Sequence, residues 1–245
     1  MSTPIFDDNL RRLRRERAMR LGGDRFLYAR AFEDCLDRLM DISTDFKAAL
    51  VIGDSEEMSA ATLAKSLPNV SVTFASDADI LQVEPGSFDL CIAIGQLESS
   101  NDLTMSAFAL RHSLSPGGLL LGAVVGGNSL PRLRAAIIAA DRTSGTVSPR
   151  VHPSIDGASL AALLGSVGLI QSVIDIDRVD VRYPDLDRLI ADLRAMGCTN
   201  ILAERSRRPL MRHQLDIARA EFLTGDKMAI ERFEILHFAA WSPQI

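Results

Sequence analysis

The chain has 245 residues and a formal net charge of −5 at pH 7, with 47% hydrophobic and 24% charged residues, as expected for a globular protein with a full core. The acidic balance is atypical of a protein that coats nucleic acid, so we expect no nucleic-acid partner. No apolar run approaches the roughly 20 residues of a membrane span, and the N-terminus lacks a signal-peptide core, so we predict a cytoplasmic protein without a transmembrane segment.

The N-terminal segment is rich in arginine. Residues 5–20 predict a basic helix in which arginines alternate with leucines: Arg11, Arg12, Arg14, Arg15, Arg17 and Arg20 with Leu10, Leu13 and Leu21. Such a helix can bind an acidic protein partner or a membrane surface, or can be a solvated face lying on the domain. A second helix is predicted over residues 25–40. We assign residues 1–46 to an N-terminal helical extension.

Strands and helices then alternate. Residues 48–53 form an apolar run typical of a parallel strand covered on both faces. The pattern continues with a helix over 58–67, strands over 70–75 and 88–94, a helix over 103–114 and a strand over 119–125. This order predicts an α/β fold with a mostly parallel sheet and right-handed crossovers.

The C-terminal half contains more helix. We predict helices over residues 130–140, 158–167, 185–196 and 209–222, and strands over 169–183 and 233–241. We assign residues 47–245 to one domain with insertions at about 126–156 and 184–230. The second insertion carries a basic patch, which is either a site for an acidic partner or a solvated face: Arg205, Arg207, Arg208 and Arg212.

Cysteine and histidine spacing does not indicate a metal site. Cys35, Cys91 and Cys198 are far apart and odd in number, which suits a reducing compartment. Cys91 lies in an apolar strand and is predicted to be a core residue. The histidines do not cluster, so we expect no metal ligands: His112, His152, His213 and His237.

Several motifs resemble class I S-adenosylmethionine (SAM)-dependent methyltransferases. They are IFDDNLRR (5–12), PGSFDL (85–90), NDL (101–103) and LSPGGL (114–119). They resemble in particular the branch that holds the malonyl-carrier-protein methyltransferase of biotin synthesis and the mitochondrial complex I assembly factor described as an arginine hydroxylase. Resemblance to the assembly-factor side comes from GGNSLPRLR (126–134), SPRV (148–151), RY (182–183), LRAMG (193–197), FEI (233–235) and WSP (241–243). The resemblance implies a Rossmann-like fold and SAM as cofactor.

The departures from this family fall at the cofactor site. Its first loop normally reads as an acidic residue followed by Gly-x-Gly-x-Gly, whereas here Gly53 is followed by Asp54-Ser55-Glu56-Glu57. Only about a dozen residues separate residue 75 from residue 88, which is too few for the usual strand, helix and strand of the ribose-binding region, so we favour a deletion. The branch often has His-Trp after its fourth strand, where this chain has Gln96-Leu97. We expect the first loop no longer to admit SAM.

Three functions stay open. In a methyltransferase, Gly53 permits backbone approach to SAM, Asp54 or Asp77 holds a ribose hydroxyl, and Gln96 lines the transfer site. The two aspartates are otherwise loop or helix-cap residues, and Gln96 is otherwise a loop residue beyond a strand end.

In a non-catalytic scaffold or assembly factor, the arginine-rich N-terminal helix and the insertions bind a protein partner, and one from a respiratory complex is the partner that the resemblance suggests. The third function, arginine hydroxylation, requires an oxidant, and the sequence shows no 2-His-1-carboxylate set.

Overall fold

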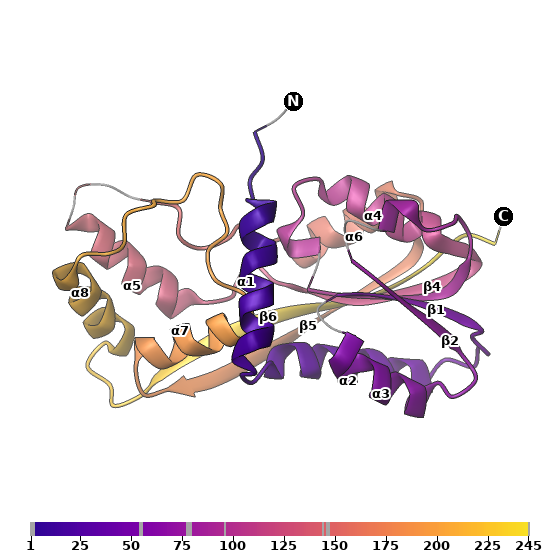
Figure 1. The fold of residues 1–245 in the computed structure, drawn as a ribbon, viewed down its shortest axis with the longest axis horizontal. Helices are drawn as coiled ribbons and strands as arrows, with labels where there is room; N and C mark the ends of the chain where they lie inside the picture. Colours follow the sequence, from indigo (N-terminus) through magenta and orange to yellow (C-terminus); the bar gives the residue numbers. More distant parts are fainter. Residues whose placement is uncertain are drawn as a thin grey trace. The chain divides into compact units, whose positions relative to one another are not determined.

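The chain folds around one six-stranded sheet of strand order β2-β1-β3-β4-β6-β5 (Figure 1). The computed structural model describes residues 3–53, 56–76, 80–95, 97–143, 145 and 148–244, and their side chains except those of 56–59 and 81. The first four strands of that order are parallel, and β6 is antiparallel to β4. The strands are β1 (Ala48–Gly53), β2 (Ser71–Ala75), β3 (Phe88–Ile94), β4 (Leu114–Val125), β5 (Ile170–Tyr183) and β6 (Ala229–Trp241).

Helices precede, connect and follow these strands. They are α1 (Asp8–Leu21), α2 (Phe26–Met40), α3 (Glu56–Ser66), α4 (Leu103–Ser113), α5 (Pro131–Arg142), α6 (Gly157–Ser166), α7 (Leu186–Ala195) and α8 (Arg212–Leu223), with short 3-10 helices η1 (Ile80–Gln82) and η2 (Leu97–Ser99). In the described part of the chain, every helix is too short or too polar to cross a bilayer.

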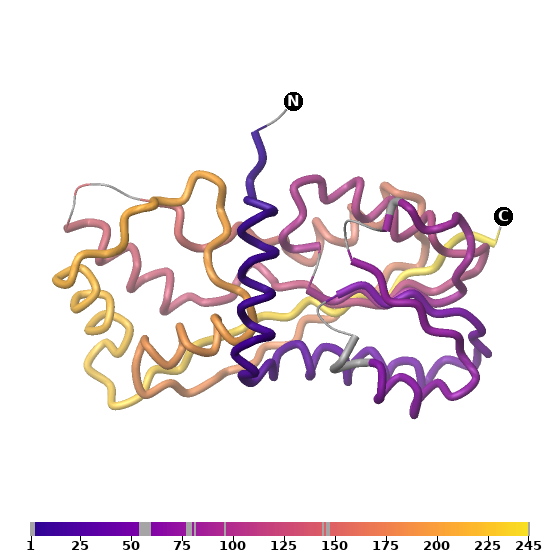
Figure 2. The backbone as a smooth tube through the Cα atoms, in the orientation of Figure 1, coloured from indigo at the N-terminus to yellow at the C-terminus, as the bar shows by residue number. Residues whose placement is uncertain are grey.

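The chain divides into two compact units. The sheet unit comprises Phe26–Gly126, Ile155–Asp177 and Ile235–Ile245. The helical unit comprises Met1–Arg25, Gly127–Ser154 and Arg178–Glu234. The neighbouring strands β5 and β6 each contribute residues to both units. Figure 2 traces the path of the backbone through the chain by residue number.

The sheet unit has three layers. Helices α2 and α3 cover one face of its strands, and α4 and α6 cover the other (Figure 1). Because both faces are covered, the central strands are apolar along their whole length. The core contains Leu50, Cys91, Leu120 and Phe238, none of them exposed to solvent.

The helical unit is built from α1, α5, α7 and α8, in which α5 and α7 contact α8 and α1 contacts α7. A small apolar cluster of Phe6, Ile201 and Leu202, with Leu10 beside it, joins the start of α1 to the segment after α7. Phe6 and Leu202 also form an isolated antiparallel bridge. This bridge holds the first residues of the chain against residues about 200 positions later.

The predicted elements are confirmed, with small shifts at their ends. Strand β4 begins at Leu114 rather than at residue 119, because Leu114 pairs with Phe88, and the register shifts before Leu119 pairs with Leu90. Helix α8 begins at Arg212, after the proline at which the prediction began it. The alternating order, the mostly parallel sheet and the burial of Cys91 are also as expected.

Two larger-scale expectations bear on the site. Between β2 and β3 the described residues contain only η1, and β2 is the last strand of the sheet on that side, as the deletion predicts. Helices α1 and α2 fall in different units, although the sequence grouped both in an N-terminal extension. The division into an extension (1–46) and a domain (47–245) stays a prediction.

Candidate functional site

The direction in which successive strands are added to the sheet reverses between β1 and β3. After β1 the chain continues to β2 on one side, and after β2 it continues to β3 on the other side. In open α/β sheets, ligands bind beyond the carboxyl ends of the strands at such a switch point. The candidate site is therefore the edge formed by Gly53 at the end of β1 and by Ile94 and Gly95 at the end of β3, which pair in parallel register.

Gly53 is tightly enclosed by the neighbouring strand. Its φ is +153°, and a Cβ added to it would lie 2.4 Å from the carbonyl oxygen of Ile94. A side chain there would collide with the backbone of β3, so the packing of the two strands by itself requires glycine. The predicted role of Gly53 in the approach to a cofactor stays a prediction.

Gly95 is in contact with an aromatic ring from α2. Its φ is +72°, and a Cβ added to it would lie 2.3 Å from Cε1 of Tyr28. The half-buried Tyr28 ring therefore lies against the backbone at the carboxyl end of β3. Sequence reasoning missed Tyr28, because its place in an amphipathic helix looked like ordinary core packing.

A small recess lies next to this edge. It is lined by Ile52, Ile80, Ala93, Leu97, Ser100, Ser106 and Leu110. Its volume is about 20 Å³, which is room for roughly one water molecule, whereas pockets for drug-sized ligands span about 300 Å³ or more. The hydroxyls of Ser100 and Ser106 lie 2.7 Å apart and bond to one another.

Three of the four predicted cofactor residues, Asp54, Asp77 and Gln96, lie outside the described residues. Glu56 and Glu57 begin α3, and their side chains are likewise outside the description. Of the predicted set, the structure therefore places only Gly53. In the described part of the chain, no group of three His, Cys, Asp or Glu side chains is arranged to hold a metal ion.

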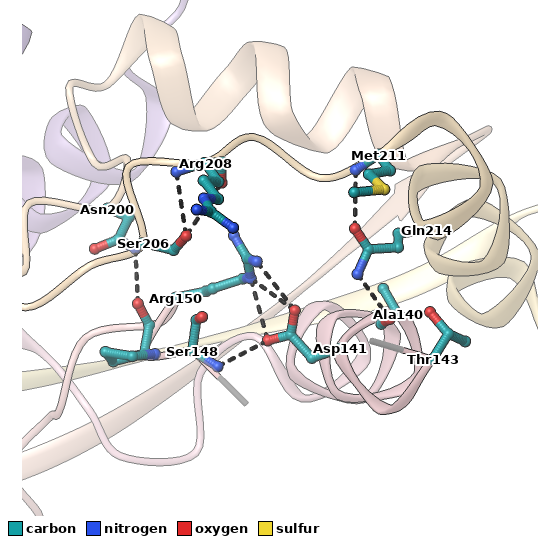
Figure 3. Close-up of polar contacts among 11 residues, drawn as sticks. Ala140, Asp141, Thr143, Ser148, Arg150, Asn200, Ser206, Arg208, Met211 and Gln214 are labelled. Carbon is teal, nitrogen blue, oxygen red and sulfur yellow. Dashed lines mark hydrogen bonds and ion pairs between the residues drawn. The ribbon is translucent and has the colours of Figure 1, made fainter. Parts of the chain in front are cut away.

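The helical unit contains a buried polar network that fixes the segment around SPRV (148–151). The buried carboxylate of Asp141 accepts from both Nε and Nη2 of Arg150, the latter at 3.0 Å, and from the backbone N–H of Ser148 at 3.1 Å (Figure 3). The amide Nδ2 of Asn200 donates to the carbonyl of Pro149 at 3.0 Å. The network connects α5 to the segment that follows α7.

His152 lies in the same unit and is held in its neutral form. Its Nε2 accepts the backbone N–H of Ile201 at 3.0 Å, and its ring meets Phe6 edge-on. Burial, together with repulsion from Arg14 and Arg134, lowers the pKa of His152 to about 4. A neutral histidine whose Nε2 already accepts a backbone N–H serves to position the chain.

Two groups of curated relatives are named for different activities. The chain is 28% identical over 231 residues to the mouse (Mus musculus) mitochondrial arginine-hydroxylase NDUFAF5, covering 84% of this chain and 67% of the relative. It is 26% identical to the zebrafish (Danio rerio) protein of the same name, covering 98% and 83%. It is 32% identical over 170 residues to a malonyl-[acyl-carrier protein] O-methyltransferase of Xylella fastidiosa, covering 68% of this chain and 56% of the relative.

The chain is a relative of both groups. The resemblance to this branch of class I methyltransferases is thereby confirmed. The chain spans just over half of the length of the malonyl-carrier relative. No family model matches the chain.

Solved methyltransferase structures resemble this methyltransferase-like chain only in general outline. A SAM-dependent methyltransferase from Archaeoglobus fulgidus has a TM-score of 0.47 at 12% identity, covering 89% of this chain and 95% of that one. A phosphoethanolamine N-methyltransferase from Haemonchus contortus, solved with SAM, has a TM-score of 0.48 at 14% identity, covering 86% and 53%. The Rossmann-like assignment rests instead on the strand order and on the curated relatives.

Proposed function

We propose that this protein is a methyltransferase-fold scaffold that binds a protein partner and does not use SAM. The observation that carries the proposal is the contact between Tyr28 and Gly95, which fills the carboxyl edge of β3 with an aromatic ring. The enclosed Gly53, the recess of about 20 Å³ and the short connection between β2 and β3 support it. On this proposal the edge of the sheet stays without SAM and the protein transfers no methyl group.

The sequence of the first loop supports the same proposal. Asp54, Glu56 and Glu57 follow Gly53, and a cluster of carboxylates repels the carboxylate of SAM. Glu56 and Glu57 fall in the first turn of α3, where negative charge stabilises the helix dipole. The loop thus suits an empty site better than an occupied one.

The relatives favour a second candidate, methyl transfer, because one group of them is named for that activity. In that case Asp54 or Asp77 holds the ribose and Gln96 lines the transfer site. Arginine hydroxylation, named for the other group, requires an oxidant, and the described residues supply no 2-His-1-carboxylate set. We infer from these relatives that the partner is a protein, and a respiratory-complex subunit is the first candidate.

A cytoplasmic location stays part of the proposal. The relatives named NDUFAF5 are mitochondrial proteins. A mitochondrial setting for this chain would keep the scaffold function and would change only the set of available partners.

Calorimetric titration with SAM and with S-adenosylhomocysteine tests the proposal. We expect no heat of binding at millimolar ligand and no co-purified nucleoside, because the edge is closed and the loop is acidic. Micromolar binding, corresponding to about −8 kcal/mol, would overturn the scaffold function and favour methyl transfer.

A loop variant tests which feature of the chain, the acidic loop or the shortened connection, excludes SAM. The variant Ser55→Gly/Glu57→Gly introduces two glycines into the first loop. The control Ser59→Gly/Glu84→Gly replaces one serine and one glutamate by glycine outside that loop. We expect neither variant to bind SAM, because the shortened connection after β2 remains. Tight binding by the loop variant alone would show that the loop, and not the deletion, excludes SAM.

A further inference from the structure

Two arginine-rich segments that are far apart in the sequence lie together in the helical unit. The backbone N–H of Asp7 donates to the carbonyl of Ile201 at 2.9 Å, next to the bridge between Phe6 and Leu202. The carboxylate of Asp7 pairs with Arg205 at 3.3 Å. Arg14 donates to the hydroxyl of Thr199, and Gly197 lies next to Arg15, so residues 5–21 and 194–208 are neighbours at several points.

These two segments carry a local positive charge on an acidic protein. Together they contain ten arginines and four acidic residues, whereas the whole chain has a net charge of −5. We define the arginine surface as Arg14, Arg17, Arg194, Arg205 and Arg207. Such a concentration of one sign attracts and orients a partner of the opposite sign.

Three of these arginines are available to a partner. Arg17, Arg194 and Arg207 are exposed, and no described residue forms an ion pair with any of them. In the same unit, by contrast, Arg188 pairs with Asp192 at 3.1 Å and Arg232 pairs with Asp180 at 2.7 Å. The guanidinium groups of Arg17, Arg194 and Arg207 can therefore each donate two hydrogen bonds to one carboxylate.

Arg14 lies at the inner side of this surface and lacks a counter-charge. It donates to the hydroxyl of Thr199, while its buried Nε has no hydrogen-bond partner in the described structure. Burial lowers the pKa of Arg14, and repulsion from Arg205, Arg17 and Arg194 lowers it further. An anion placed among these groups would relieve that repulsion.

The surroundings favour a carboxylate-rich protein segment over other polyanions. The only aromatic residue in the two segments is Phe6, which is 4% exposed, so stacking on nucleic-acid bases has no platform. The exposed apolar residues of α1 are Leu13, Met19 and Leu21, which at about 100° per residue are spread around the helix and form no single apolar stripe for a membrane.

We propose that the arginine surface binds a carboxylate-rich segment of a protein partner. The inference rests on the proposed scaffold function and adds the chemistry of its partner. Arg17, Arg194 and Arg207 hold the partner's carboxylates at the exposed side. Arg14 and Arg205 supply the positive field behind them.

Fluorescence anisotropy with a labelled Glu-Ser repeat peptide tests the proposal on the full chain, with a Gln-Ser repeat as the uncharged control. We expect the Glu-Ser peptide to bind, and its affinity to fall between about 50 mM and about 300 mM NaCl as charges are screened. In Arg17→Gln/Arg194→Gln/Arg207→Gln the affinity should fall about tenfold, because three exposed ion pairs are lost.

A control variant has the same change in net charge at residues outside the arginine surface. Arg142→Gln/Arg182→Gln/Lys227→Gln also neutralises three exposed cations, and we expect it to change the peptide affinity less than twofold. Removing repulsion around Arg14 should leave the surface variant at least as stable as the parent in urea, which separates loss of binding from loss of fold.

The proposal is overturned by equal affinities in the two triple variants, or by no Glu-Ser binding to the parent at millimolar peptide. It is also overturned if a single-stranded oligonucleotide or an anionic vesicle binds more tightly than the peptide through the same arginines. These outcomes are independent of the SAM titration, so failure of this surface is distinguishable from failure of the scaffold function.

Discussion

Gly95 shows how a single residue determines the packing next to the candidate site. With a φ of +72° it has a backbone conformation that L side chains rarely adopt, and the ring of Tyr28 occupies the direction of the missing side chain. Both requirements, the positive φ and the free space, select glycine. The ring of Tyr28 thereby packs against the backbone at the carboxyl end of β3.

Gly95→Ala should lower the free energy of unfolding by about 3 kcal/mol, from backbone strain plus overlap with Tyr28. Gly22→Ala is the control, because Gly22 also has a positive φ, +59°, but a Cβ there would meet nothing within 4 Å. It should cost about 1 kcal/mol. In urea unfolding, Tyr28→Ala should recover most of the difference when combined with Gly95→Ala. Equal losses in the two glycine variants would contradict the contact.

At the level of elements, α5 begins without a cap of its own. Its N-cap residue, Leu130, has a φ of 60° and offers no capping side chain. The fully buried carboxylate of Glu231 in β6 replaces the cap, accepting from the backbone N–H groups of Arg132 at 3.2 Å, Leu133 at 2.8 Å and Arg232 at 3.0 Å. Burial raises the pKa of Glu231, while these hydrogen bonds oppose that shift.

Glu231→Ala should therefore destabilise the protein by about 3 kcal/mol, because one buried and two partly buried backbone donors lose their acceptor. Glu231→Gln keeps one carbonyl oxygen as acceptor, so its loss of unfolding free energy should be about half of the loss in Glu231→Ala. Glu221→Ala removes an exposed glutamate in α8 and should change the unfolding free energy by less than about 0.5 kcal/mol. Chemical denaturation of the three variants measures these differences, and a loss in Glu231→Ala no larger than in Glu221→Ala would refute the cap.

For the whole molecule, the expected response to acid comes from one histidine in each unit, partly buried His152 and buried His237. In the helical unit, burial and nearby arginines lower the pKa of His152 to about 4. In the sheet unit, burial is the main cause that lowers the pKa of His237, whose Nδ1 lies 2.9 Å from a carboxylate oxygen of Asp34. In both units the folded state therefore favours a neutral histidine that the unfolded chain protonates near its ordinary pKa.

The stability of the protein should decrease as the pH falls from about 6.5 towards 4. In this window the unfolded chain binds a proton that His152 does not bind in the folded state, so the free energy of unfolding rises with pH. The shift in the pKa of His152 corresponds to a loss of about 3 kcal/mol, complete near pH 4. Urea unfolding across this range measures the slope.

Two variants identify the histidine responsible. His152→Gln should flatten the slope, because its amide oxygen accepts the Ile201 N–H without titrating. His213→Gln replaces an exposed histidine and should leave the slope unchanged. A slope that is the same in both variants would assign the pH dependence to other groups.

Much of the fold could be predicted because its signals are local. The apolar run of β1, the turn at residues 85–87 before β3 and the Pro-Gly-Gly turn in β4 each carry their own pattern. The ordered motifs added the methyltransferase resemblance. The candidate site could be predicted only in part. Tyr28 has no distinguishing pattern in its helix, so the sequence did not indicate it. The predictions for Asp54, Asp77 and Gln96 stay predictions, because these residues lie outside the described residues.

The sequence by itself determined the order of helices and strands, the family resemblance and the loss of glycines after Gly53, since these depend on neighbouring residues. Only the tertiary structure decided that Tyr28 covers Gly95, that Glu231 caps α5 and that the arginines of α1 join those after α7. Each of these contacts joins residues tens to hundreds of positions apart. Which distant side chains meet depends on how strands and helices pack, and that packing leaves no periodic trace in the chain.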